Sequence, residues 1–132
     1  MSRIIAMSEA ASIAIHSLVL IARSEGKLNV VKISEATGSS KHHVAKVLQR
    51  MVKDGYLISG RGPSGGFLMR KSPEEITLLN IFEAIEGKIE VNHCPMENPV
   101  CPFDKCLMGN IVTKITKQFR DHLASQTLAE LI

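Results

Sequence analysis

The sequence contains no tryptophan and only one tyrosine, and aromatic residues make up 4% of its 132 positions. Hydrophobic residues still account for 45% of the chain, so the core must be built from aliphatic side chains and methionine. A core of this kind favours helices packed against helices. A chain of this length is enough for one domain with a buried core.

The sequence also lacks a long apolar run without polar or charged residues. Its most hydrophobic segment, near the N-terminus, includes Glu9 and His16. These residues argue against a membrane span and against a cleaved signal peptide. We therefore expect a cytoplasmic protein with no membrane partner. No Ser/His/Asp arrangement or pair of carboxylates stands out, so we expect no enzymatic activity.

Apolar periodicity predicts five helices and a last capped turn. Their ranges are 3–23, 30–38, 39–55, 72–87 and 107–126, with the turn at 127–132. Gly38 and Gly55 suit helix ends, and Thr77 is a plausible N-cap. Two short apolar segments around GRGPSGG predict a β-hairpin over residues 56–71.

The helices predicted over 30–38 and 39–55 are joined by a tight Gly-Ser-Ser turn, which is typical of a helix-turn-helix. A core stripe is predicted in the second helix, at Val44, Val47, Leu48 and Met51. The second helix of this motif lies in the DNA major groove with its N-terminal residues nearest the bases. We therefore predict DNA contacts from Ser39, Ser40, Lys41, His42, His43, Lys46 and Arg50.

Positive charge is concentrated around this motif. Residues 39–71 contain seven basic residues against the single acid Asp54, a net +6, which leaves −3 for the rest of a chain whose net charge is +3. An ordinary solvated surface is the alternative to an anionic partner.

The glycine-rich loop that follows the predicted helix-turn-helix contains Arg61, Gly62 and Ser64. Glycines allow a backbone to approach a phosphate closely, and arginine suits the negative potential of a narrow minor groove. A plain hairpin with an incidental arginine is the alternative. Because the glycine-rich loop comes directly after a basic helix-turn-helix, we favour the interpretation that it is a wing that binds double-stranded DNA.

All three cysteines, Cys94, Cys101 and Cys106, fall within HCPMENPVCPFDKC (93–106). In a reducing compartment, clustered cysteines are more often metal ligands or redox sensors than disulfides. The C-x2-C pair common in zinc sites is absent, and the wide spacing suits an iron–sulfur cluster. Three thiolates leave a fourth ligand position where oxygen or nitric oxide could react. Free thiols, a peroxide-sensing disulfide switch and structural zinc remain alternatives.

The last long helix has an apolar seam at Met108, Val112, Ile115, Phe119 and His122/Leu123. This spacing is typical of a two-helix interface. Packing on the chain's own core is the alternative. We favour a homodimer, because helix-turn-helix proteins usually read paired half-sites.

Together these segments resemble the winged-helix iron–sulfur transcription regulators, a family with IscR, NsrR and CymR types. The resemblance is carried by GRGPSGGF (60–67), ITLLNIFEAIEG (76–87), the three cysteines and TLAEL (127–131). It implies a homodimer crossed by helix 107–126, with the three cysteines as cluster ligands. The CymR-like members lack this trio.

The resemblance also bears on the fourth cluster ligand. IscR-like members have a histidine three residues after the last cysteine, where this chain has Gly109. In NsrR-like members, an acidic residue from the partner's first helix can complete a 4Fe–4S cluster, and Glu9 aligns with that position. The alternative for Glu9 is a solvent-facing charge. The cysteine spacing is six plus four residues here, in place of the family's five plus five.

The resulting hypothesis is a mainly α winged helix-turn-helix with a small β-hairpin wing and a long C-terminal dimerisation helix. Its expected parts are a DNA-binding domain (1–90), a cysteine-rich cluster-binding loop (91–106), and a dimerisation helix with a C-terminal turn (107–132). The expected function is a repressor of a DNA operator that senses nitric oxide, redox state or iron–sulfur status through a cluster, with 4Fe–4S favoured over 2Fe–2S. The alternative is a cluster-free regulator controlled by a partner protein or by thiol oxidation.

Overall fold

The computed structural model describes residues 5, 7–60, 65–91 and 102–132. This part of the chain is mainly helical and contains one two-stranded antiparallel sheet, which confirms the predicted fold class. The elements, in order, are α1 (Glu9–Arg23), α2 (Val30–Thr37), α3 (Lys41–Lys53), β1 (Leu57–Ser59), β2 (Phe67–Met69), the 3-10 helix η1 (Pro73–Glu75), α4 (Leu78–Glu86), α5 (Ile111–Ser125) and the 3-10 helix η2 (Leu128–Leu131).

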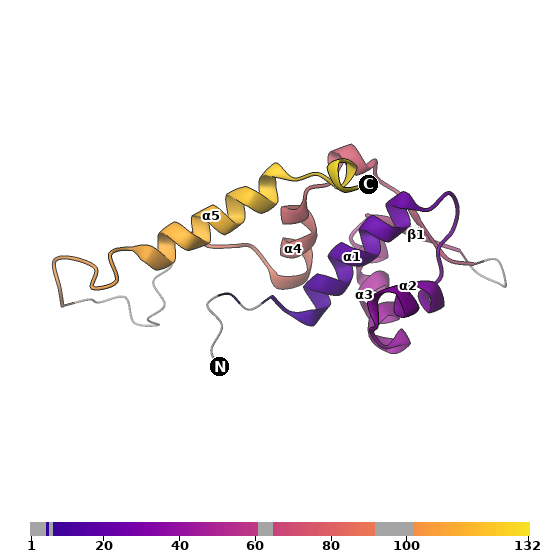
Figure 1. Ribbon diagram of the computed structural model, residues 1–132, viewed down its shortest axis with the longest axis horizontal. Coiled ribbons are helices and arrows are strands. Elements are labelled where there is room, and N and C mark those ends of the chain that lie inside the picture. Colours follow the sequence, from indigo (N-terminus) through magenta and orange to yellow (C-terminus); the bar gives the residue numbers. More distant parts are fainter. Residues whose placement is uncertain (1–4, 6, 61–64, 92–101) are drawn as a thin grey trace.

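Two regions are visible in Figure 1. Helices α1, α2 and α3 gather with the hairpin at one side, and α5 extends away from them at the other, beyond α4. Helix α1 packs against α4, α3, β2, α2 and η2, so it joins the two regions. Its buried face consists of Ala11, Ile13, Ala14, Ser17, Leu18 and Ile21.

The predicted core stripe of α3 is confirmed, because Val44, Leu48 and Met51 are fully buried and Val47 nearly so. Ile33, Leu57, Phe67, Ile76, Ile81 and Leu128 complete the main cluster with the buried face of α1. Only one member of this cluster is aromatic, as the composition predicted. Mostly aliphatic side chains from α1, α2, α3, α4, the 3-10 helix η2 and the hairpin therefore form a single core.

The first helix begins later than predicted, at Glu9 rather than at residue 3. Ser8 has an extended backbone, and its hydroxyl oxygen accepts a hydrogen bond from the Ala11 N–H at 3.0 Å. This is an N-cap, which satisfies an N–H group that the first helical turn leaves free. Apolar periodicity alone did not predict that Ser8 would cap the helix and so set its first residue.

The helix predicted over 72–87 is also interrupted. Ile76 is extended, and its carbonyl oxygen accepts a hydrogen bond from the Leu128 N–H at 2.9 Å, while the Leu78 N–H donates to Gln126 O at 2.9 Å. This pairing draws the backbone out of the helical conformation between η1 and α4. Thr77 then caps α4 as predicted, in a capping box with Asn80.

The last long helix begins at Ile111 rather than at residue 107. Gly109 and Asn110 have φ values of +61° and +58°, in the left-handed region. Two successive left-handed residues cannot continue a right-handed helix. The chain therefore turns at 106–110 before α5 begins.

The hairpin is anchored to the helical core at its base. Leu57 pairs with Met69, Ile58 with Leu68, and Ser59 with Phe67. Leu28, in the turn between α1 and α2, forms an additional bridge to Phe67 through N–H···O bonds of 2.9 and 3.2 Å. Within the described ranges, no helix is long and apolar enough to cross a lipid bilayer.

The core can be tested at two adjacent positions of α3. Leu48→Ala should lower the free energy of unfolding by about 2–5 kcal/mol, because it leaves a cavity at a fully buried site. Gln49 is exposed, so Gln49→Ala should change stability by at most about 0.5 kcal/mol. Urea unfolding followed by circular dichroism measures both, and equal losses would contradict the assigned core face.

Candidate functional site

The face of α3 opposite its core stripe is basic and open to solvent. Lys41, His42, Lys46 and Arg50 are exposed, and His43 is half-buried. Ser40 is the N-cap, and its hydroxyl oxygen accepts a hydrogen bond from the His43 N–H at 3.1 Å. The predicted DNA-contacting residues of α3 therefore share one surface, and Ser40 also fixes where the helix begins.

The turn before α3 is held by local hydrogen bonds. Gly38 ends α2 with a φ of +71°, a backbone conformation that favours glycine. The Ser34 hydroxyl donates to the Ser39 carbonyl oxygen at 2.5 Å. These constraints fix the angle between α2 and α3. The predicted helix-turn-helix is thus present. Ser39 and Ser40, which were predicted to contact DNA, also form hydrogen bonds that hold the turn and begin α3.

The root of the predicted wing is described, but its tip is not. The Gly60 N–H donates to Gly66 O at 2.8 Å and closes the hairpin at that point. Arg61, Gly62 and Ser64 lie outside the described residues, so their DNA contacts stay predictions.

Cys106 lies in the turn that precedes α5 and has an exposed, free thiol. Hydrogen bonds from the backbone N–H groups of Asn110, then Met108 and Gly109, lower the pKa of Cys106 below its usual value, although slight desolvation opposes them. The left-handed residues 109 and 110 curl the chain so that these groups face the sulfur. A thiolate stabilised in this way is the form that binds metal and that reacts with oxidants.

These backbone donors were not predicted from the sequence, where only Gly109 hinted at a sharp turn. Cys94 and Cys101 lie outside the described residues. Within the described segments, no three His, Cys, Asp or Glu side chains come together as a metal site. The composition of the cysteine-containing ligand set therefore stays a prediction.

Glu9 lies in the first turn of α1, beside α3. Its carboxylate Oε1 is 3.6 Å from His43 Nδ1, and the Glu9 side chain is 70% exposed. It also borders a polar groove of about 500 Å³ between α1 and the α2–α3 turn, lined in addition by Ser12, His16, Thr37 and Ser39 among others. An exposed pair of this kind contributes little to stability, but it places an exposed carboxylate against α3.

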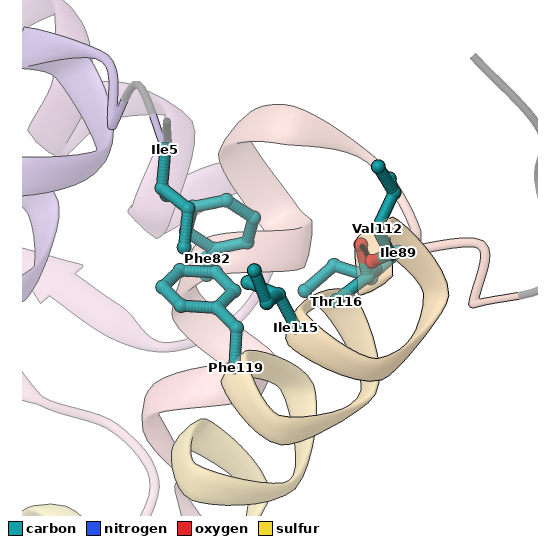
Figure 2. Close-up of a pocket in the computed structure, with 7 residues that line it drawn as sticks. All are labelled: Ile5, Phe82, Ile89, Val112, Ile115, Thr116 and Phe119. Carbon is teal, nitrogen blue, oxygen red and sulfur yellow. Dashed lines mark hydrogen bonds between the residues drawn. The ribbon is translucent and has the colours of Figure 1, made fainter. Parts of the chain in front are cut away.

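The predicted seam of α5 divides into two parts. Towards its C-terminal end, Leu123 is buried, and the ring of Phe119 meets Phe82 of α4 edge to face, with centroids 5.4 Å apart. Figure 2 shows these rings and Ile115 pointing toward one another, with Ile5 beside Phe82, in an apolar groove of about 300 Å³. This part packs on the chain's own core, which was the alternative interpretation.

The N-terminal end of the seam is uncovered. Met108 is 65% exposed and Val112 39% exposed, and their neighbours Leu107 and Ile111 are exposed as well. Large side chains grouped in this way on a soluble protein usually mark an interface.

Comparison with known proteins identifies the family. The family model for Rrf2, described as an iron-dependent transcriptional regulator, matches residues 7–132. The chain belongs to the Rrf2 family. The match confirms the resemblance drawn from the sequence, and it makes the chain a DNA-binding transcriptional regulator, in agreement with the basic face of α3.

Individual relatives are distant. The chain is 29% identical over 120 residues to the HTH-type transcriptional regulator IscR of Pectobacterium carotovorum, an alignment that covers 91% of this chain and 70% of the relative. Its fold is similar to that of B. subtilis CymR, a global cysteine regulator (TM-score 0.80, 22% identity, 97% and 96% of the two chains), and to that of T. potens IscR (TM-score 0.75, 22% identity, 96% and 85%). Staphylococcus aureus CymR in an oxidised form is also similar (TM-score 0.75, 20% identity, 96% and 95%). At these identities, the structural similarity shows the fold alone.

The environment of Cys106 predicts how its thiol titrates. In a Cys94→Ser/Cys101→Ser variant, the Cys106 thiolate should form at a lower pH in the folded protein than in the same protein unfolded in urea. The reason is that the turn 106–110 must be intact for its N–H groups to face the sulfur. The pH dependence of alkylation by iodoacetamide measures this. An equal or higher midpoint in the folded state would contradict the described geometry.

Proposed function

We propose that this Rrf2 regulator is a homodimeric repressor whose affinity for a double-stranded DNA operator is set by an iron–sulfur cluster bound to Cys94, Cys101 and Cys106. The observation that carries the proposal is the Cys106 thiol, which is exposed and free in the turn before α5 and which backbone N–H groups stabilise as the thiolate, the form that binds iron. Hydrogen bonds to sulfur also tune the reduction potential of such clusters. When bound, the cluster would supply a reactive iron centre for a small oxidant or for nitric oxide.

We assign the fourth ligand to Glu9 of the partner subunit. Figure 1 places the segment that carries Cys106 at the outer end of α5, far from the start of α1 in the same chain. A Glu9 carboxylate could therefore complete the site only from a second subunit. A carboxylate is a weaker ligand for iron than a thiolate, which suits a reactive corner. Nitric oxide is our leading signal, and a 4Fe–4S cluster is favoured over a 2Fe–2S cluster.

The uncovered end of the α5 seam supports the dimer. Leu107 and Met108 are the most exposed large hydrophobic residues of the described chain, at 73% and 65%, and Ile111 and Val112 continue the surface along α5. Burying them against a second α5 would remove this apolar surface from water.

Transmission to DNA follows from the position of Glu9. In the described structure, the Glu9 carboxylate faces His43 on α3. Ligation of iron by Glu9 of the partner subunit would separate that carboxylate from His43 and would tie α1 to the opposite subunit. Each head would then adopt a different orientation on its half-site, and operator affinity would change.

Thiol oxidation is the second candidate signal, and the same residue favours it. Cys106 is exposed and has a lowered pKa, which are the properties of a redox-sensitive cysteine. In this case, Cys106 would respond to peroxide without any bound iron.

Anaerobic purification separates the two candidates. We expect a coloured protein containing iron and acid-labile sulfide, and Cys106→Ser should lose both. Glu9→Gln should retain the cluster under nitrogen but lose it faster in air, because an amide is a poorer iron ligand. Glu25→Gln is the matched control, since Glu25 is another exposed carboxylate outside the proposed ligand set. A colourless wild-type protein with three titratable thiols would reject the cluster proposal, and equal lifetimes for all variants would reject Glu9 as a ligand.

The dimer interface has its own test. Ile111→Lys with Val112→Glu should convert the dimer to a monomer, because it places charges in the centre of the proposed apolar contact. Lys114→Glu on the same helix is the control and should leave the dimer intact, since Lys114 points away from the seam. Sedimentation velocity measures the oligomeric state, and an unchanged dimer in the double variant would place the interface elsewhere.

A further inference from the structure

Lys27 lies in the turn between α1 and α2, outside the stretch 39–71 in which positive charge is concentrated. The fold nevertheless brings it to the wing. Its neighbour Leu28 exchanges two backbone hydrogen bonds with Phe67, the first residue of β2, at 2.9 and 3.2 Å. This isolated bridge fixes the α1–α2 turn beside the hairpin, so backbone pairing sets the position of Lys27 relative to the root of the wing.

The side chain of Lys27 lies across the two glycines that close the root of the wing. An ideal Cβ built on Gly60 would be 2.6 Å from Lys27 Nζ and 3.2 Å from its Cε, and one built on Gly66 would be 3.1 Å from Lys27 Cβ. Gly60 and Gly66 are joined by the last hydrogen bond of the hairpin before its tip. The two glycines therefore provide a surface without side chains, and Lys27 fills it.

The two glycines differ in what they accommodate. A Cβ on Gly66 would also lie 2.9 Å from the Leu28 carbonyl oxygen, so Gly66 is needed for the close approach of two backbones. A Cβ on Gly60 would meet only the Lys27 side chain within 4 Å among its nearest atoms, and Gly60 does not have a positive φ. A side chain on Gly60 would therefore displace the Lys27 ammonium, which is the end of a flexible side chain, from its present position.

The Lys27 ammonium has no acidic partner within the part of the chain that the structure describes. Among the described residues, no carboxylate lies within ion-pair distance of it, and the side chain is exposed. In the docking expected for a winged helix-turn-helix, α3 enters the major groove and the wing lies along the minor groove. A cation at the root of the wing would then lie near the phosphates that separate the two grooves.

We propose that Lys27 is a DNA-backbone contact that acts together with the wing, and that Gly60 is kept free of a side chain so that the Lys27 ammonium can lie there. The contact carries no sequence information. It strengthens binding to operator and to unrelated DNA alike, as phosphate contacts do. The proposal does not depend on the cluster, because it concerns the DNA-binding head in any state.

Binding to a mixed-sequence DNA duplex, measured by fluorescence anisotropy over a range of salt concentrations, tests this contact. Lys27→Ala should weaken binding by roughly three- to tenfold at low salt and reduce the slope of log affinity against log salt by about 0.9 for each head on the duplex. Lys27→Arg should restore both. The control is Lys117→Ala, since Lys117 pairs with Asp121 on α5, at 2.6 Å. An unchanged slope for Lys27→Ala, or the same loss for Lys27→Arg, would overturn the proposal.

A second variant tests the role of Gly60. Gly60→Ala places a methyl group where the ammonium lies, so it should weaken DNA binding in the wild-type background. It should have no further effect in the Lys27→Ala background, because the group that it displaces is then absent. Equal losses in both backgrounds would show that Gly60 acts independently of Lys27. Thermal unfolding of each variant verifies that the head remains folded, and a loss of binding that merely follows a loss of folding would also count against the proposal.

Discussion

The burial of α1 is the constraint on which the rest of this structure depends. The helix packs against three other helices, the hairpin and the C-terminal turn, and Ala11 and Ala14 have no exposed surface. Small side chains at these positions let neighbouring helices approach closely. One end of α1 carries Glu9 beside α3, and the turn that follows its other end is bridged to the hairpin through Leu28 and Phe67. Helix α3 and the hairpin, the two elements proposed to contact DNA, therefore both pack against α1.

This arrangement indicates where a regulatory signal has its effect. The contact between Glu9 and His43 is exposed, and such pairs contribute about 0–1 kcal/mol. A tenfold change in operator affinity needs about 1.4 kcal/mol, so making or breaking this pair alone falls short of a switch. A displacement of α1 would change operator affinity more than the loss of this pair, because it would reorient α3 and the wing together. Under the proposed function, Glu9 is the point at which the partner's cluster is attached, and a displacement of α1 is what changes the orientation of the head.

The sequence predicted what local chemistry determines. The core stripe of α3, the glycine that ends α2 and the Thr77 cap all follow from periodicity and capping rules, and each is confirmed. Features that depend on distant pairing could not be predicted in this way. The break at Ile76 arises because the Leu128 N–H donates to its carbonyl oxygen and Leu78 donates to Gln126. The position of Lys27 at the root of the wing arises because Leu28 pairs with Phe67 of β2. The donors to the Cys106 sulfur are backbone groups, which leave no side-chain pattern.

The central claim is that an iron–sulfur cluster, acting through α1, sets the affinity of this regulator for DNA. Its most direct test compares one anaerobic preparation before and after exposure to nitric oxide, with operator fragments selected from genomic DNA by the protein itself. The account predicts that operator affinity changes by about tenfold or more, or about 1.4 kcal/mol, and that a variant with all three cysteines replaced by serine shows no change. Equal affinity before and after exposure, or the same response in the serine variant, would contradict it.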